Sequence, residues 1–177
     1  MPPQPQGVWN SVYNDSKWVD AKGKDRYRRA IYTYIKRTSG YPSFLTFDAS
    51  DHDVSLARRI PTNTPLQALV TLNDPVYQEA SEALARRMMR ETGTLDGRLR
   101  YGARLVLSRD PTDGELAILR RLYEEALAAP ASPRGVPRTV PRIVKIAARA
   151  ESKSGKELAA MTAVASVLFN LDAALTR

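Results

Sequence analysis

The chain has 177 residues, of which 43% are hydrophobic, contains no cysteine and carries a formal net charge of +8. The absence of cysteine excludes disulfides, thiolate nucleophiles, iron–sulfur clusters, Cys-ligated zinc and haem attachment through a Cys-x-x-Cys-His motif. No apolar run approaches the roughly 18 residues that a membrane-spanning helix needs, and no signal-peptide pattern opens the chain, so the composition favours a soluble globular domain.

The first third of the sequence predicts an extended lead-in followed by one helix. Residues 1–24 begin with three prolines in five positions and show no sustained hydrophobic period, which predicts an extended segment. Residues 25–37 place apolar side chains at helical spacing with basic residues opposite, which predicts a helix whose aromatic side chains belong to the core. The apolar positions are Tyr27, Ala30, Ile31, Tyr34 and Ile35, and the basic ones are Arg26, Arg28, Arg29 and Lys36. The segment "SGYPSF" ends this helix, and we predict a loop from there to Thr64.

Two helix starts follow, ten residues apart. Thr64, Pro65 and Gln67 combine a Thr N-cap, a proline at the first helical position and a capping-box glutamine, which predicts a short helix ending near Asn73. Asp74 and the proline after it begin a second helix in the same way, reaching about residue 91. Its predicted apolar stripe contains Val76, Tyr77, Ala80, Leu84 and Met88.

Two further helices are predicted between residues 96 and 128. One follows Asp96 and turns Leu99, Ala103 and Val106 inward. The other begins at a capping box formed by Thr112 and Glu115. The core face of this second helix consists of Leu116, Leu119, Tyr123 and Ala126.

The remainder of the chain divides into a basic segment and a closing helix. Residues 129–141 hold four prolines and predict a linker, and residues 142–156 predict a short basic amphipathic helix that ends near Gly155. The segment 129–156 carries seven basic side chains and one acid, so it supplies +6 of the net charge. Residues 157–177 predict a last helix whose nearly heptad stripe needs a partner helix. Because strand-type alternation is hard to find, we predict an all-α fold: an irregular domain of about five to six helices with a long loop-rich N-terminal third.

One cluster of acidic residues and the only histidine, Asp48, Asp51, His52 and Asp53, offers candidates for acid and base chemistry. A calcium loop counted from Asp48 lacks the glycine at its sixth position and the glutamate at its twelfth, so no metal site is predicted. No strand-turn-helix elbow surrounds a serine, which argues against a serine nucleophile. The alternative is that these side chains form turns and caps that organise the loop.

A second candidate is a site for an anionic or sugar ligand at the two helix starts, where backbone N–H groups and the helix dipole favour negative charge. Its residues would be Arg58, Arg59, Asn63, Thr64, Gln67, Asn73 and Asp74. The alternative, which we favour, is that the caps already occupy those N–H groups and that the arginines pair with the aspartates. The basic face of residues 134–156 could meet nucleic acid or an acidic membrane, but it lacks interleaved aromatic residues, and we favour a solvated face.

The stretch from "YRRAIYTYIKRT" through "RIPTNTPLQALVTLNDP" resembles the C-terminal half of the planctomycete PSD domain family, a family of unknown function. The segments "LVLSRDPTDGEL" and "ELAAMTAVASVLFNLDAALTR" resemble its closing parts. The resemblance implies that residues 1–128 are the C-terminal half of such a domain, that residues 129–156 are a linker and that residues 157–177 pack back on the same domain. It also implies a partner, the upstream part of the same polypeptide.

Members of that family look exported to the bacterial envelope and often carry a cytochrome c module. The resemblance therefore implies a periplasmic or envelope protein linked to polysaccharide breakdown, with a sulfated or acidic glycan as a possible ligand and haem only in an upstream module, so no cofactor is expected in this chain. The leading hypothesis is a noncatalytic or accessory helical domain. The alternatives are an active site completed by the upstream region, and nucleic-acid binding by the basic segment, which we do not favour.

Overall fold

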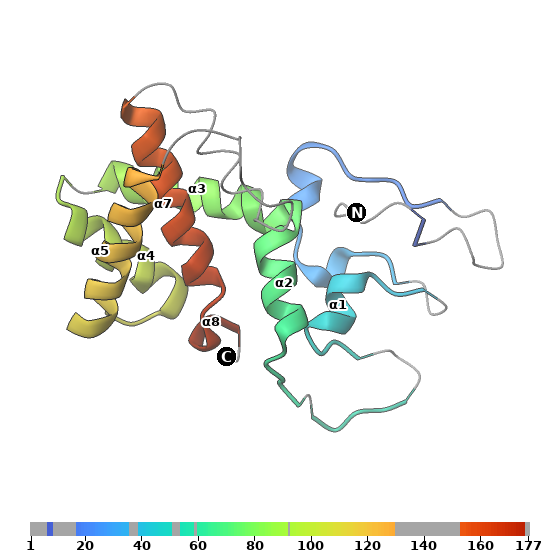
Figure 1. Cartoon of the computed structure of the whole chain (residues 1–177). Coiled ribbons are helices and arrows are strands. Elements are labelled where there is room, and N and C mark those ends of the chain that lie inside the picture. The colour runs from blue at the N-terminus through green and yellow to red at the C-terminus, as the bar shows by residue number, and fades with distance from the viewer. Residues whose placement is uncertain are drawn as a thin grey trace. The chain divides into compact units, whose positions relative to one another are not determined.

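The structure, a computed structural model, describes residues 7–8, 17–35, 39–50, 54–58, 60–91, 93–129 and 153–175 (Figure 1). Within these ranges it contains seven α-helices, two 3-10 helices and no strand, so the predicted all-α class is confirmed. The chain divides into two compact units, Met1–Gln67 and Ala68–Arg177. The predicted linker and most of the basic helix, residues 130–152, lie outside the described ranges.

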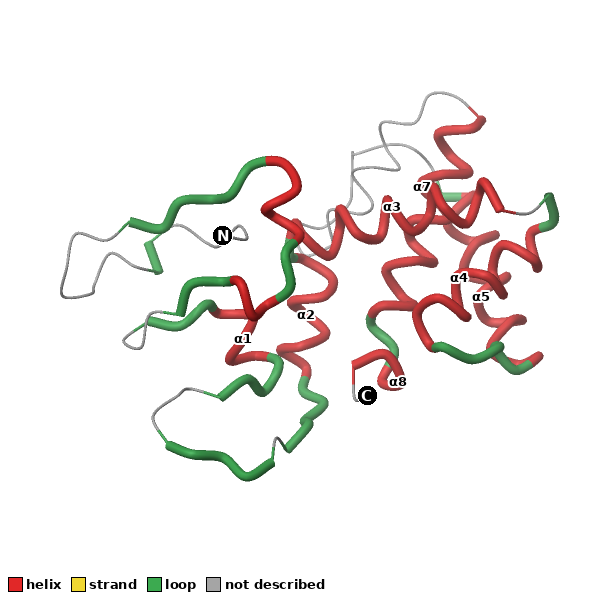
Figure 2. Tube along the Cα trace, turned by 180° about the vertical axis from the view of Figure 1, so that it is seen from behind, coloured by secondary structure: helices red, strands yellow, loops and turns green. Residues whose placement is uncertain are grey.

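The predicted helix over residues 25–37 is wrong. The segment forms two 3-10 turns, η1 (Gly23–Tyr27) and η2 (Ala30–Tyr32), separated by Arg28 and Arg29 with ψ angles of 147° and 151°. The apolar positions that were assigned to the core are exposed, with 81% of Ile31 and 58% of Tyr27 open to solvent. An isolated helix of this length is marginal in water unless an amphipathic face packs against a partner, and the neighbouring arginines repel one another. Loops and short turns make up most of the residues that the structure describes in the first unit (Figure 2).

A small aromatic cluster forms the core of the first unit. The loop predicted from "SGYPSF" to Thr64 contains a short helix, α1 (Pro42–Thr46), with proline at its first position. Tyr41, just before it, is only 7% exposed. Its ring stacks on Trp18 at a centroid distance of 5.6 Å and meets Phe44 edge-on at 5.2 Å. These contacts join the lead-in to α1, because offset and edge-on aromatic pairs add stability beyond their buried area.

The two closely spaced helix starts are where the sequence places them. Helix α2 runs Pro65–Asn73 and helix α3 runs Pro75–Glu91, each with proline at its first position. The buried line of α3 differs from the predicted stripe, because Gln78 and Ser81 are buried where Val76, Tyr77 and Ala80 were expected to be. Leu84 and Met88 are buried as predicted.

Four more helices complete the second unit: α4 (Leu95–Leu107), α5 (Asp113–Ala128), α7 (Lys153–Phe169) and α8 (Asp172–Leu175). Helix α4 begins at a Thr94 N-cap rather than at Asp96. Helix α7 begins at Lys153 and includes Gly155, where the basic helix before it was predicted to end. The closing helix breaks after Phe169 and resumes as α8. Helix α7 packs against α3 and α5, and α4 packs against the same two helices, so the last helix has the partners that its stripe requires.

The core of the second unit is closely packed. Fully buried side chains on α7 are Met161, Val164, Ala165 and Leu168, which lie in one cluster with residues of α3, α4 and α5. Helices α3 and α4 approach closely at Gly102, where a Cβ atom would lie 2.5 Å from the Cε atom of Met88. The absence of a side chain at Gly102 gives Met88 its space.

Truncation of Leu168 to alanine is expected to lower the free energy of unfolding by about 2–5 kcal/mol, because the side chain is fully buried and leaves a cavity. Ile118→Ala is the matched control, since this side chain on α5 is 59% exposed, and it should change stability by less than about 0.5 kcal/mol. Urea denaturation followed by circular dichroism measures both. Equal stability losses in the two variants would contradict the observed core.

The capping box that opens α5 has a measurable pH dependence. The Glu115 carboxylate accepts two hydrogen bonds from Arg109, at 2.9 and 2.6 Å, and one from the Thr112 backbone N–H at 2.7 Å. The bonds from Arg109, followed by that from Thr112, lower the pKa of Glu115 to about 2 from its ordinary value of 4.5. Because the folded pKa is the lower one, Glu115 stabilises the fold above pH 4.5, and this contribution is lost as the pH falls towards 2.

We therefore expect Glu115→Gln to be less stable than the wild type at pH 6 and the two proteins to converge between pH 4.5 and 2. Glutamine keeps a capping side chain but carries no charge for Arg109. Urea denaturation at a series of pH values gives the difference directly, and Glu124→Gln, an exposed position on the same helix, is the control. A stability difference that did not change with pH would refute the assignment.

Candidate functional site

The start of α2 is closed by a reciprocal capping box. The Gln67 backbone N–H lies 3.4 Å from the Thr64 hydroxyl, and the Thr64 backbone N–H donates to Gln67 Oε1 at 3.2 Å. This confirms the capping box read from the sequence. The backbone N–H groups of Thr64 and Gln67, which an anion could have used at this helix end, are bound within the protein itself.

The Gln67 amide also binds the loop that precedes the helix. Its Nε2 atom donates to the Thr46 carbonyl at 2.9 Å and to Thr62 Oγ1 at 3.2 Å, with Asp48 Oδ2 at 3.4 Å. Only 1% of Gln67 is exposed. Because an unpaired buried amide is costly, these partners hold the end of α1 and the entry to α2 at fixed positions around one side chain.

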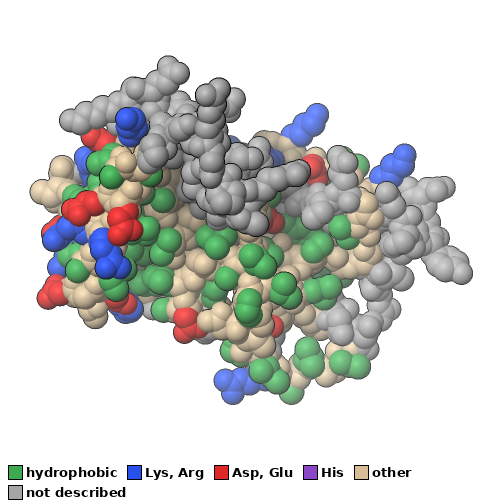
Figure 3. Space-filling view, in the orientation of Figure 1, with side chains coloured by type: hydrophobic (Ala, Val, Ile, Leu, Met, Phe, Trp, Pro, Cys, Tyr) green, Lys and Arg blue, Asp and Glu red, His purple; other side chains and the backbone are tan. Residues whose placement is uncertain are grey.

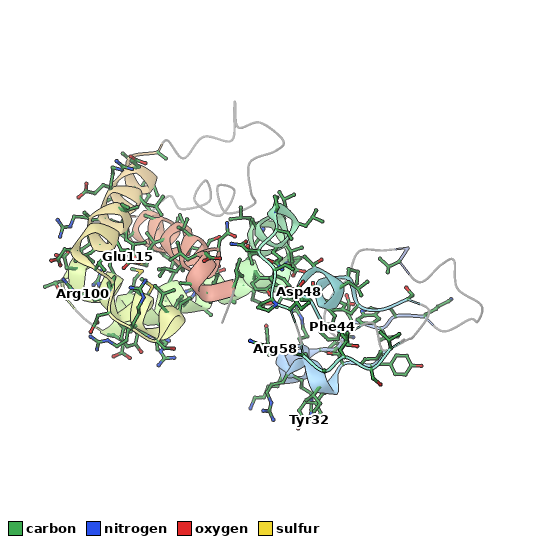
Figure 4. The ribbon with its side chains drawn as sticks, turned by 90° about the horizontal axis from the view of Figure 1, so that it is seen from below. Tyr32, Phe44, Asp48, Arg58, Arg100 and Glu115 are labelled. Carbon is green, nitrogen blue, oxygen red and sulfur yellow. The ribbon has the colours of Figure 1, made fainter. Side chains whose placement is uncertain are left out.

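Asp48 has a structural role that requires both its backbone and its side chain. Its φ angle of 58° lies in the left-handed region, which aspartate tolerates better than most residues. The Ala49 N–H donates to the Phe44 carbonyl at 2.8 Å and the Asp48 N–H lies 3.4 Å from the Leu45 carbonyl, which is the Schellman pattern that ends a helix. Figure 4 shows Asp48 beside Phe44 at this end of α1.

The Asp48 carboxylate closes a loop. It accepts from the Thr62 backbone N–H and from the Thr62 hydroxyl, each at 2.7 Å. These bonds join the two ends of residues 49–61, which we call the pinched loop. The carboxylate that was a candidate acid or base is used to hold the ends of this loop together, so at Asp48 the turn-and-cap alternative agrees with the structure.

The other predicted residues divide into those that the structure describes and those that it does not. Arg58 is exposed on the pinched loop, and Asn63 is exposed just after it. Asp51, His52, Asp53 and Arg59 lie outside the described residues, so their predicted roles stay predictions. Among the residues that are described, no group of three or more His, Cys, Asp or Glu side chains is arranged to hold a metal ion.

Asn73 and Asp74 serve the junction between α2 and α3. The Val76 N–H donates to Asp74 Oδ1 at 2.8 Å, and Asn73 Nδ2 donates to the Leu69 carbonyl at 2.8 Å. Burial raises the pKa of the Asp74 carboxyl, and the hydrogen bond from Val76 acts in the opposite direction. Gln78 Nε2 reaches the carbonyls of Leu72 and Asn73 at 3.2 and 3.4 Å, which satisfies the end of α2.

Three residues that stabilise these helix starts were not predicted from the sequence. They are Thr62 and Gln78, described above, and Thr71, whose hydroxyl lies 3.0 Å from the Ala68 carbonyl and 2.9 Å from Asn170 Oδ1. A hydroxyl has one hydrogen, so Thr71 donates to one oxygen, and an Asn170 amide turned to present its NH₂ group satisfies the other contact. Polar residues at buried helical positions were the available indication for Thr71 and Gln78.

The pinched loop presents apolar side chains to solvent. Val54, Leu56 and Ile60 are 64%, 56% and 79% exposed, and Arg58 lies among them. In the space-filling view, hydrophobic side chains and a basic one line the loop at the lower edge (Figure 3). A surface loop fixed at its ends and carrying aliphatic side chains is typical of a binding element.

The family PSD1, described as "Protein of unknown function (DUF1553)", matches residues 1–123, which is more than half of the chain. The chain belongs to the PSD1 family. No curated protein and no solved structure matches it. The match covers the pinched loop, both capped helix starts and α4 of this PSD1 domain. None of the helices described for the PSD1 domain is long and apolar enough to cross a membrane.

We expect Asp48→Asn to loosen the pinched loop without disturbing the second unit. Asparagine tolerates the left-handed backbone but offers one acceptor oxygen in place of two, so one of the bonds from Thr62 is lost. A hydrogen bond to a charged group is worth about 1.5–3 kcal/mol, so the Thr62 amide hydrogen should exchange roughly 10-fold to 100-fold faster.

Hydrogen exchange by NMR tests this at single residues. Amides of α7 are the internal reference, and Asp110→Asn, which removes a surface pair with Arg104 at 2.7 Å, is the matched variant. Unchanged exchange at Thr62 in Asp48→Asn would show that the loop does not depend on the carboxylate.

Proposed function

We propose that this PSD1 domain is a noncatalytic accessory domain that recognises a protein partner through the pinched loop. The observation that carries the proposal is the exposure of Val54, Leu56 and Ile60 on a loop whose ends are fixed by Asp48. The polar groups most suited to chemistry, those of Asp48, Gln67 and Asp74, are bound to backbone groups of the protein. The pinched loop therefore offers a ligand its shape and its apolar side chains.

Fixed loop ends favour binding for an entropic reason. A loop that is free in solution must be ordered when it binds, and each immobilised side chain reduces the affinity further. Bonds from Thr62 to Asp48 and from Gln67 to Thr62 fix the later end of the loop before any partner arrives. Three aliphatic side chains that are buried on binding can then contribute about 1.5–3 kcal/mol each.

The aliphatic character of the loop selects among the partners. A sulfated or acidic glycan would meet one described cation, Arg58, but would gain little from valine, leucine and isoleucine side chains. A protein surface gains from all of them, and arginine is enriched at such interfaces. We propose as partner the upstream segment of the same polypeptide that the family resemblance implies. That resemblance also supports a place in the bacterial envelope, in a protein linked to polysaccharide breakdown.

The test uses residues 1–177 and, as a separate polypeptide, the segment encoded immediately upstream. Val54→Ser, Leu56→Ser and Ile60→Ser combined should weaken binding in calorimetric titration by at least about tenfold, since tenfold corresponds to 1.4 kcal/mol. The control combines Leu105→Ser, Ile118→Ser and Leu127→Ser, which are exposed positions of the second unit. Equal binding by both triple variants would refute the proposal.

The enzyme alternative makes a different prediction in the longer polypeptide. Substitution of Asp53 or Arg59 would abolish turnover while the melting temperature stays the same. A fall in melting temperature would instead assign these residues to the structure of the loop.

A further inference from the structure

A second surface of the first unit combines positive charge with exposed apolar side chains. Residues 22–35, which we call the basic aromatic surface, carry five cations and one acid, a net charge of +4. The cations are Lys22, Lys24, Arg26, Arg28 and Arg29, of which Arg26 is half-buried and the other four are exposed. A partner that matches this surface electrostatically is negatively charged.

The apolar side chains of this surface are unusually open. Ile31 is 81% exposed, the highest value among the large hydrophobic residues of the described chain, and Tyr32 is 62% exposed. Tyr27, Tyr34 and Ile35 belong to the same short segment and are exposed as well. In Figure 4, Tyr32 lies at the outer edge of the ribbon and points away from it. Large apolar side chains gathered on a surface indicate an interaction site.

The two 3-10 turns place cations over the tyrosine rings. The Arg26 guanidinium carbon lies 5.8 Å from the centroid of the Tyr27 ring, and Arg28 lies at the same distance from the Tyr32 ring. Arg28 is also held by Asp25, with Nε 2.7 Å from the carboxylate. Charged heads and aromatic rings are thereby held together, the combination that suits the interface between water and lipid headgroups.

The exposed aliphatic side chains of the basic aromatic surface distinguish between classes of negatively charged partner. Single-stranded nucleic acid binds basic surfaces by stacking its bases on aromatic rings, and sulfated glycans bind through hydrogen bonds and ion pairs, so neither makes use of an exposed isoleucine. A lipid surface uses all three components: isoleucine enters the acyl boundary, tyrosine lies at the headgroups and the cations meet anionic phosphate. We propose that residues 22–35 dock this domain on an anionic phospholipid membrane as a peripheral contact.

The experiment measures sedimentation of residues 1–177 with vesicles of phosphatidylcholine, alone or mixed three to one with phosphatidylglycerol. Binding should require phosphatidylglycerol and should fall steeply as salt is raised, since the headgroup charge is screened within a Debye length. Equal partition onto both kinds of vesicle, or no partition onto either, would overturn the proposal.

Two variants separate charge from insertion. Lys24→Gln with Arg29→Gln should weaken binding to the anionic vesicles by roughly 30-fold, because each cation near the membrane surface raises the affinity about fivefold. Ile31→Ser should weaken it by about tenfold while leaving the charge unchanged. The matched controls are Arg86→Gln with Arg121→Gln, and Ile118→Ser, all exposed positions of the second unit, and they should bind as the wild type does.

Competitor polyanions identify the alternative partners. Heparin and oligothymidylate are titrated against the wild type and Ile31→Ser in the same buffer. If either binds both proteins equally and Ile31→Ser retains full vesicle binding, the surface recognises negative charge alone and the lipid proposal fails. The variant with Val54, Leu56 and Ile60 changed to serine should still bind vesicles, so failure here and failure of the pinched-loop proposal are distinguishable.

Discussion

The amide of Gln67 is the interaction on which the first unit depends. One side chain accepts from the Thr64 backbone and donates to the Thr46 carbonyl and the Thr62 hydroxyl, while only 1% of it is exposed. These bonds join the end of α1, the later end of the pinched loop and the first turn of α2. A buried amide left without partners would cost more than each bond contributes, and here Nε2 has three acceptors, the Thr46 carbonyl, Thr62 Oγ1 and Asp48 Oδ2. These polar residues therefore form one hydrogen-bond network.

Asp48 ends α1 and closes the pinched loop, which Gln67 alone does not do. A helix ending in a left-handed residue most often has glycine there, because glycine has no Cβ atom. Here the position is occupied by aspartate, whose carboxylate reaches 14 residues along the chain to Thr62. A glycine would fit the backbone and lose the closure of the loop. The choice of residue is explained by two requirements met at once, and catalysis is not needed to account for it.

Sequence-based predictions were correct for interactions between residues close together in the sequence and failed for interactions between residues far apart. Capping boxes at Thr64 and Thr112 and the proline starts of α2 and α3 were predicted correctly, because each involves residues within about four positions. The bonds from Gln67 to Thr46 and from Thr71 to Asn170 span 21 and 99 residues, and no local pattern reveals them. The helix over residues 25–37 failed for a related reason. Its apolar spacing was real, but whether such a face is buried depends on a partner element that spacing cannot show.

Exposed hydrophobic side chains are unevenly divided between the units. Of fifteen such large residues in the described chain, eleven lie before residue 68, although the second unit is the longer one. The second unit buries its apolar stripes against one another, as the fully buried Val164 and Leu168 show. The first unit has a small aromatic core and satisfies its polar groups by long-range hydrogen bonds, which leaves aliphatic and aromatic side chains outside. A segment built in this way remains folded while it presents apolar surface, and that is the property a recognition unit requires.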